Sequence, residues 1–123
     1  MSPAIVRKDG EVVLVTGSIG GSRIITATLQ VILNVIQHDM SVSEAVNAPR
    51  FHHQWLPDEV IVEPGFPEDT LKALSDRGFV FKTDEAGQFV TQEFGRANSV
   101  ASDGDYVYGA SDPRDSKSAA AGH

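Results

Sequence analysis

The fold of this chain depends on LVTGSIGGSRII, residues 14–25, where a strand-like run, a glycine-rich turn and an apolar helix follow one another. The overlapping residues Val12–Val15 are apolar on both faces, which is typical of a strand inside a covered sheet. Ser22 is a suitable N-cap for a helix that reaches about His38. A strand, a tight turn and a helix in this order predict layers of sheet and helix.

The turn at Gly17–Ser22 permits two interpretations. It is not a P-loop, because no Gly-Lys-Ser or Gly-Lys-Thr follows, and it misses the dinucleotide-binding pattern because Ile19 stands where the second glycine belongs. One interpretation is a purely structural turn. The other is a cradle of backbone N–H groups for a phosphate, a carboxylate or the oxyanion of an acyl transfer. The pattern by itself leaves both open.

The helix predicted after this turn is apolar over most of its circumference. Its polar side chains recur at spacings of three and four and form one narrow stripe: Arg23, Thr26, Gln30, Asn34 and Gln37. A helix of this kind is normally packed between layers, so we expect it in the core. We also expect poor solubility if its covering layers are missing.

The rest of the chain predicts two hairpins, two shorter helices and irregular connections. The hairpin strands, joined by turns of Asp and Gly, are Ala4–Lys8 with Glu11–Thr16 and Ala97–Ser102 with Tyr106–Ala110. The helices are one that Ser41 and Glu44 open as a capping box and Pro49 ends, and one over Pro67–Arg77 that Gly78 stops. The remaining assignments are an irregular Phe51–Pro57, strands Val60–Glu63 and Phe79–Lys82, a loop Asp84–Gly95 and a frayed tail over residues 116–123.

No repeat and no domain boundary is visible. Residues 1–123 are therefore predicted to form a single partial domain of the α+β class.

Composition limits the classes of partner. The 123 residues are 41% hydrophobic and 22% charged, and the net charge of −7 argues against nucleic acid and anionic membrane surfaces. The longest apolar stretch, Ile24–Ile36, is too short and too interrupted to span a bilayer, which needs about 20 apolar residues. The chain contains no cysteine, so disulfides and thiol catalysis are excluded.

The histidines and serines favour structural roles over catalysis. His52 and His53 point to opposite sides of an extended segment and make a poor ligand pair, so we predict no metal site. No serine lies in a Gly-x-Ser-x-Gly elbow. We expect caps and turns for the four candidates, which are Ser18, Ser22, Ser99 and Ser111.

Two arginines are candidates for binding a carboxylate. Arg114, in Ser111-Asp112-Pro113-Arg114, is better explained by an internal ion pair at a turn than by a bound ligand. Arg50, just past a predicted helix end, is explained in the same way.

Longer stretches of the chain resemble the gamma-glutamyltransferases. They are Met1–Pro3, Leu14–Ile25, Asn47–Asp58 and Tyr108–Arg114, with the ending Ala121-Gly122-His123. The resemblance covers nearly the whole chain in the same order and at similar spacing. It implies an N-terminal-nucleophile hydrolase fold, an αββα sandwich of two sheets between helix layers.

The resemblance also implies a mechanism. Enzymes of this family cleave their own precursor into a large and a small subunit, and the new N-terminal threonine of the small subunit is the nucleophile, with its amine available as base. A gamma-glutamyl group passes from glutathione to this threonine and then to water, an amino acid or a peptide. No metal or organic cofactor is implied.

Within the family, this chain resembles the C-terminal portion of the small subunit. The threonine is expected upstream of a chain that starts directly in a hairpin, so the chain alone is expected to be inactive. Gly20 and Gly21 match the glycines whose N–H groups form the oxyanion hole, and they are the expected catalytic and substrate-binding residues. Arg50 and Arg114 match positions of structural support, and Ile19 departs from a frequent proline.

The implied partners are glutathione and other gamma-glutamyl compounds, acceptor amino acids or peptides, the large subunit and the N-terminal part of the small subunit. Family members are usually periplasmic, extracellular or on the cell surface. Two alternatives stay open. One is a related cephalosporin or glutaryl acylase of the same fold, and the other is an inactive truncated module that binds anions at the same turn.

Overall fold

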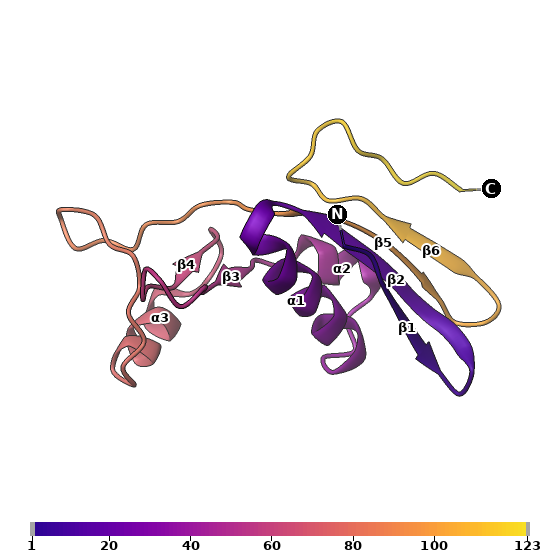
Figure 1. Ribbon diagram of the computed structural model, residues 1–123, viewed down its shortest axis with the longest axis horizontal. Helices are drawn as coiled ribbons and strands as arrows, with labels where there is room; N and C mark the ends of the chain where they lie inside the picture. Colours follow the sequence, from indigo (N-terminus) through magenta and orange to yellow (C-terminus); the bar gives the residue numbers. More distant parts are fainter. Residues whose placement is uncertain (1, 123) are drawn as a thin grey trace. The chain divides into compact units, whose positions relative to one another are not determined.

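A computed structural model describes residues 2–122 and divides them into two compact units (Figure 1). Unit 1 consists of the described residues up to Ala48 and those from Gly95 onward, and unit 2 is Pro49–Phe94. The sequence predicts one partial domain, because no change in composition marks either junction. Within the described residues, no helix has the length and apolar character needed to cross a membrane.

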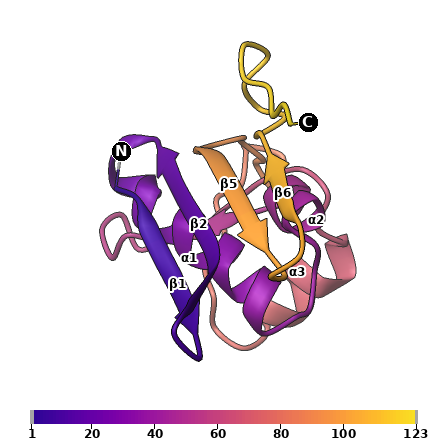
Figure 2. The same ribbon diagram turned by 90° about the vertical axis from the view of Figure 1, so that its right-hand side faces the viewer.

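Unit 1 is built on a four-stranded antiparallel sheet in the order β1-β2-β5-β6 (Figure 2). The strands are β1 (Ala4–Lys8), β2 (Glu11–Ile19), β5 (Arg96–Ser102) and β6 (Val107–Ala110). Both predicted hairpins are present. Their inner strands pair directly, with Thr16 opposite Ser99 and Gly17 opposite Asn98, so the two hairpins form one continuous sheet.

Two helices cover one face of this sheet, α1 (Ile24–Ile36) and α2 (Val42–Asn47). Their contacts with the strands form the core of unit 1, which contains Leu14, Val31, Val42, Ala45, Val46, Ala97 and Ala110. The predicted capping box opens α2. The Ser41 hydroxyl accepts the Glu44 N–H at 3.2 Å, and the Glu44 carboxylate accepts the Ser41 N–H at 2.9 Å.

The strand before the glycine-rich turn is longer than predicted. β2 continues through Gly17 and Ser18 to Ile19, so the prediction of a turn starting at Gly17 is wrong. The glycine at position 17 serves a close approach of two chain segments, because a Cβ there would lie 3.1 Å from the Cα of Pro3. The turn itself begins at Gly20.

A short 3-10 helix, Gly21–Arg23, separates this turn from α1. The prediction that Ser22 is the N-cap of the long helix is therefore wrong, since the N-cap of α1 is Arg23, with no side-chain capping bond. The hydrogen bond from the Arg23 N–H to the Gly20 carbonyl, at 3.2 Å, tightens the chain before the α-helical pattern begins.

Within this chain, α1 is buried along one face only. Ala27, Thr28 and Val31 are buried, whereas Ile25 is 75% exposed and Ile36 is 51% exposed. The expectation that the helix lies in the core is therefore wrong for its outer stripe, because unit 1 supplies one sheet and no second layer to cover that stripe. The far face of the sheet is also apolar, with the exposed Ile5, Val15 and Val100 in a row across β1, β2 and β5.

Unit 2 contains short elements around a small core. They are β3 (Phe51–His52) paired with β4 (Ile61–Val62), and α3 (Glu68–Ser75). The core residues are Val60, Val62, Leu71 and Phe81. Pro67 is the N-cap of α3, so the helix begins one position after the predicted start.

Three predictions in unit 2 need correction. The strand over Val60–Glu63 is reduced to β4, and Phe51–Pro57 is irregular only after β3. Phe79–Lys82 forms no strand. Its one pairing with the segment before β4 is an isolated parallel bridge between Phe81 and Val60. Ladders this short leave most of the segment in irregular structure.

Candidate functional site

The turn at Gly20 and Gly21 is exposed and has backbone conformations that favour glycine. Gly20 has φ +141° and Gly21 has φ +61°, both in the range that L side chains rarely adopt. A Cβ on Gly20 would lie 3.2 Å from the Cα of Gly95, while a Cβ on Gly21 would meet nothing within 4 Å. The backbone of this turn is therefore accessible to a ligand, in a geometry that other residues would disturb.

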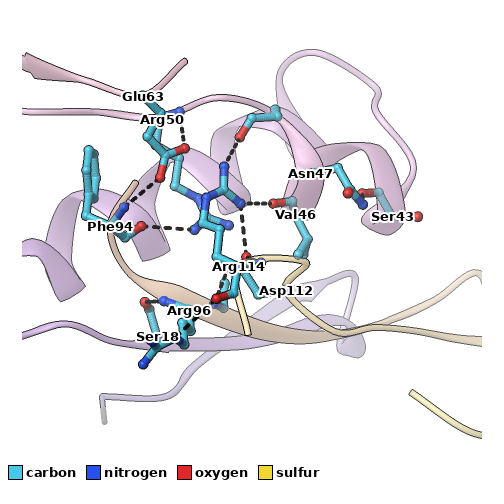
Figure 3. Close-up of polar contacts among 12 residues, drawn as sticks. Ser18, Ser43, Val46, Asn47, Arg50, Glu63, Phe94, Arg96, Asp112 and Arg114 are labelled. Atoms are coloured by element: carbon cyan, nitrogen blue, oxygen red, sulfur yellow. Dashed lines mark hydrogen bonds and ion pairs between the residues drawn. The ribbon is translucent and has the colours of Figure 1, made fainter. Parts of the chain in front are cut away.

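Ser18 fixes the strand end that carries this turn (Figure 3). Its hydroxyl donates to the Ile19 carbonyl at 3.0 Å and accepts the Arg96 N–H at 3.2 Å. The side chain of Ser18 thus joins the end of β2 to the start of β5. Ser18 is buried inside β2, so the prediction of a cap or turn position is wrong for this serine.

Asp112 and Arg114 form a buried ion pair beside β5, with 3.0 Å between the Asp112 Oδ1 and the Arg114 Nη1. The second oxygen, Oδ2, accepts the Ala97 N–H at 2.6 Å. Arg114 also donates to the carbonyls of Val46 and Ala48, each at 3.0 Å, and so satisfies the C-terminal end of α2 (Figure 3). The internal pair predicted for Arg114 is present, and its guanidinium is committed to the protein.

In unit 2, the buried Glu63 joins residues close to both ends of the unit. Its Oε2 accepts the Arg50 N–H and its Oε1 accepts the Phe94 N–H, each at 2.9 Å. The buried Arg50 donates from Nη1 to the Phe94 carbonyl at 3.5 Å. The role of Glu63 was not predicted from the sequence. The one signal for it is that this carboxylate directly follows an apolar strand.

The two histidines differ in burial and in partner. His52 is buried, with its Nε2 3.0 Å from the Gln54 Oε1, and its ring lies 5.9 Å from that of Phe94. His53 is partly exposed, with its Nε2 3.0 Å from the Asp58 Oδ1. No group of three or more His, Cys, Asp or Glu side chains among residues 2–122 is arranged to hold a metal ion.

The sequence profile of the family described as Gamma-glutamyltranspeptidase matches residues 1–122. The glutathione hydrolase proenzyme of Escherichia coli K12 is 53% identical over 125 residues, which cover all of this chain and 20% of that protein. A crystal structure of the Helicobacter pylori gamma-glutamyltranspeptidase T380A mutant superimposes with a TM-score of 0.82 at 47% identity, over 94% of this chain and 61% of that one.

The cephalosporin acylase from Bacillus halodurans is also similar, with a TM-score of 0.73 at 28% identity over 91% of this chain and 20% of that one. The chain spans about a fifth of the length of the bacterial glutathione hydrolase proenzymes that it matches along its whole length.

Proposed function

Because this chain belongs to the gamma-glutamyltranspeptidase family, we propose that it supplies the oxyanion hole of a glutathione hydrolase. The complete enzyme moves the gamma-glutamyl group of glutathione to water, an amino acid or a peptide. The observation that carries the proposal is the exposed turn at Gly20 and Gly21, whose positive φ angles favour glycine.

The N–H groups of Gly20 and Gly21 stabilise charge that develops during acyl transfer. When a threonine hydroxyl outside this chain attacks the gamma-carbonyl carbon, the carbonyl oxygen gains negative charge. Two fixed N–H donors bind that oxyanion more strongly than the neutral carbonyl, which lowers the barrier. Removal of one such donor typically costs about 2.7–4 kcal/mol in the transition state.

The contacts around the turn support this role. Ser18 joins the two strand ends beside it, and Asp112 and Arg114 tie β5 to α2. Two pre-organised N–H donors need neighbours that hold them in place, because a site that must reorganise during the reaction stabilises the transition state less. Arg50 and Arg114 serve as structural support in this proposal.

The remaining four-fifths of the enzyme complete an αββα sandwich of the N-terminal-nucleophile hydrolase type. The exposed apolar row of Ile5, Val15 and Val100 and the exposed outer stripe of α1 support this arrangement, because large apolar surfaces on regular elements mark packing faces. The rest of the enzyme carries the threonine, the large subunit and the remaining substrate contacts. By the same resemblance, the complete protein is exported and needs no cofactor.

The test replaces the matching fifth of the E. coli glutathione hydrolase proenzyme with this chain, which gives a chimeric protein that we call the graft. We expect the graft to cleave itself and to hydrolyse a gamma-glutamyl anilide, and we expect the isolated chain to show no turnover. Robust turnover by the isolated chain would overturn the role assigned to a threonine outside it. A folded graft without self-cleavage or hydrolysis would overturn the assignment to this family activity.

The similarity to the cephalosporin acylase favours a second candidate, a deacylase of the same fold. In that case the full-length protein would hydrolyse glutaryl amides and leave gamma-glutamyl amides intact. Assaying both substrate classes on the full-length protein decides between the two, since the oxyanion hole serves either reaction equally.

A further inference from the structure

Unit 2 contains an apolar cavity of about 440 Å³ between α3, the β3–β4 pair and the segment Gly78–Phe81. Its buried wall comes from the core of the unit, with Val62, Leu71 and Phe81 among the lining residues. Phe51 and Phe79 also line it and are half exposed, so they lie at its mouth. A volume of this size is typical of small-molecule sites, which hold about 300–1,000 Å³.

A histidine–aspartate pair supplies the polar side of this cavity. His53 and Asp58 both line it, and the His53 Nε2 lies 3.0 Å from the Asp58 Oδ1. The Trp55 N–H donates to the His53 Nδ1 at 3.4 Å, which helps to orient the ring with its Nε2 toward Asp58. The Asp58 side chain is 83% exposed, so a ligand can reach its carboxyl group from the solvent.

The charge around the cavity favours a cation. Asp58 is the one residue of permanent charge in the lining, which contains no lysine or arginine. Residues 49–94 carry nine Asp and Glu and four Lys and Arg, which gives unit 2 a net charge of −5. This excess of negative charge favours a cation over an anion as the ligand of the cavity.

We propose that this cavity binds a small organic cation with an apolar body, of the arylalkylamine class. The apolar body fills the space beside Leu71 and Phe81, and the ammonium group pairs with Asp58 at the mouth. His53 holds the Asp58 carboxylate in place. The proposal uses residues of unit 2 alone and does not rest on the acyl transfer proposed for the Gly20–Gly21 turn.

Calorimetric titration with three probes of one shape tests the proposal: 3-phenylpropylamine, 3-phenylpropan-1-ol and 3-phenylpropionate. The titrations use the graft, and its enzymatic activity is irrelevant to this readout. We expect the amine to bind at least tenfold more tightly than the alcohol, and the carboxylate to bind most weakly. Equal affinities for the three probes, or no binding of any, would overturn the proposal.

Two variants separate the parts of the site. Asp58→Asn should remove the preference for the amine and leave the affinity for the alcohol unchanged. Glu85→Gln, the matched control, changes the charge of unit 2 equally at an exposed residue outside the cavity lining and should preserve the preference. If both variants reduce amine binding alike, the Asp58 contact is wrong. Circular dichroism confirms that each variant is folded.

Discussion

Asp112 in unit 1 and Glu63 in unit 2 are buried carboxylates that join distant parts of the chain. They differ in the structural elements that they connect. Asp112 accepts the N–H of Ala97 at the start of β5 and pairs with Arg114, which holds the end of α2. Glu63 instead accepts backbone N–H groups near the two ends of its own unit. Asp112 and Arg114 thus connect the helix α2 to the strand β5. Glu63 holds the backbone at Arg50 close to the backbone at Phe94.

This difference separates the support of the turn from the integrity of unit 2. Ala97 directly follows Arg96, whose N–H donates to the Ser18 hydroxyl. Ser18 in turn stands two positions before Gly20. Loosening the Asp112 link should therefore disturb the glycine turn. Loosening the Glu63 link should act within unit 2.

Arg114→Ala is expected to have the largest effect on stability. It removes the ion pair and two carbonyl contacts and leaves a buried carboxylate without its cation, which typically costs about 3–5 kcal/mol. Amide hydrogen exchange in the graft should report this loss as faster opening of α2 and β5. Arg7→Ala is the control, because that side chain is exposed. Equal exchange in the two variants would refute the structural role of Arg114.

Glu63→Gln should have an intermediate effect confined to unit 2. The amide keeps one acceptor oxygen for two backbone donors, and an unsatisfied buried donor costs about 1–3 kcal/mol. The amides of Arg50 and Phe94 should exchange faster, with those of β5 unchanged. Glu93→Gln, at an exposed neighbour of Phe94, is the matched control. Faster exchange in β5 would show that the two links are not separate.

Ser41→Ala should have the smallest effect, about 1 kcal/mol from the lost N-cap of α2. The Ser41 hydroxyl donates to the Glu44 carboxylate at 2.7 Å, which lowers the pKa of Glu44 below its ordinary value of 4.5. The folded state thus favours the charged carboxylate. This contribution is present above pH 4.5 and is lost as the pH falls through the lowered pKa.

Hydrogen exchange of the α2 amides, measured above pH 4.5 and at lower pH, checks this pH dependence. The difference between Ser41→Ala and the unchanged chain should shrink on acidification. A difference that grows instead would contradict the capping box.

Local chemistry explains which parts of the fold could be predicted from the sequence. The Asp9-Gly10 turn and the Ser41–Glu44 capping box depend on neighbouring residues, and both are present in the structure. The extent of β2 depends instead on pairing with β5, about 80 positions further along the chain. Gly17 therefore suggested a turn, although it lies inside a strand. The absence of a side chain there allows the backbone of Pro3 to approach closely.

The candidate site shows the same division. The glycine turn and the Asp112–Arg114 pair could be identified because their residues are close together in the sequence. Glu63 could not, because its second partner, Phe94, is 31 positions away. The exposed stripe of α1 could not be predicted either, since an apolar pattern does not say whether the covering layer belongs to the same chain.

The most direct test of the oxyanion-hole assignment is the kcat of the graft carrying Gly20→Ala, compared with Gly10→Ala. Both substitutions introduce a side chain at positive φ, which costs about 1–3 kcal/mol in strain. A Cβ at Gly20 would also meet Gly95, whereas one at Gly10 meets nothing within 4 Å.

We expect Gly20→Ala to lower kcat for a gamma-glutamyl anilide by about 100-fold or more. Alanine keeps its N–H, but the Cβ contact with Gly95 displaces the donors of the turn from the oxyanion, which is equivalent to losing one of them. Gly10→Ala should remain within about twofold of the graft itself, because it lies in a hairpin turn away from the proposed donors. Equal kcat values for the two variants, both folded and self-cleaved, would contradict the assignment of the oxyanion hole to this turn.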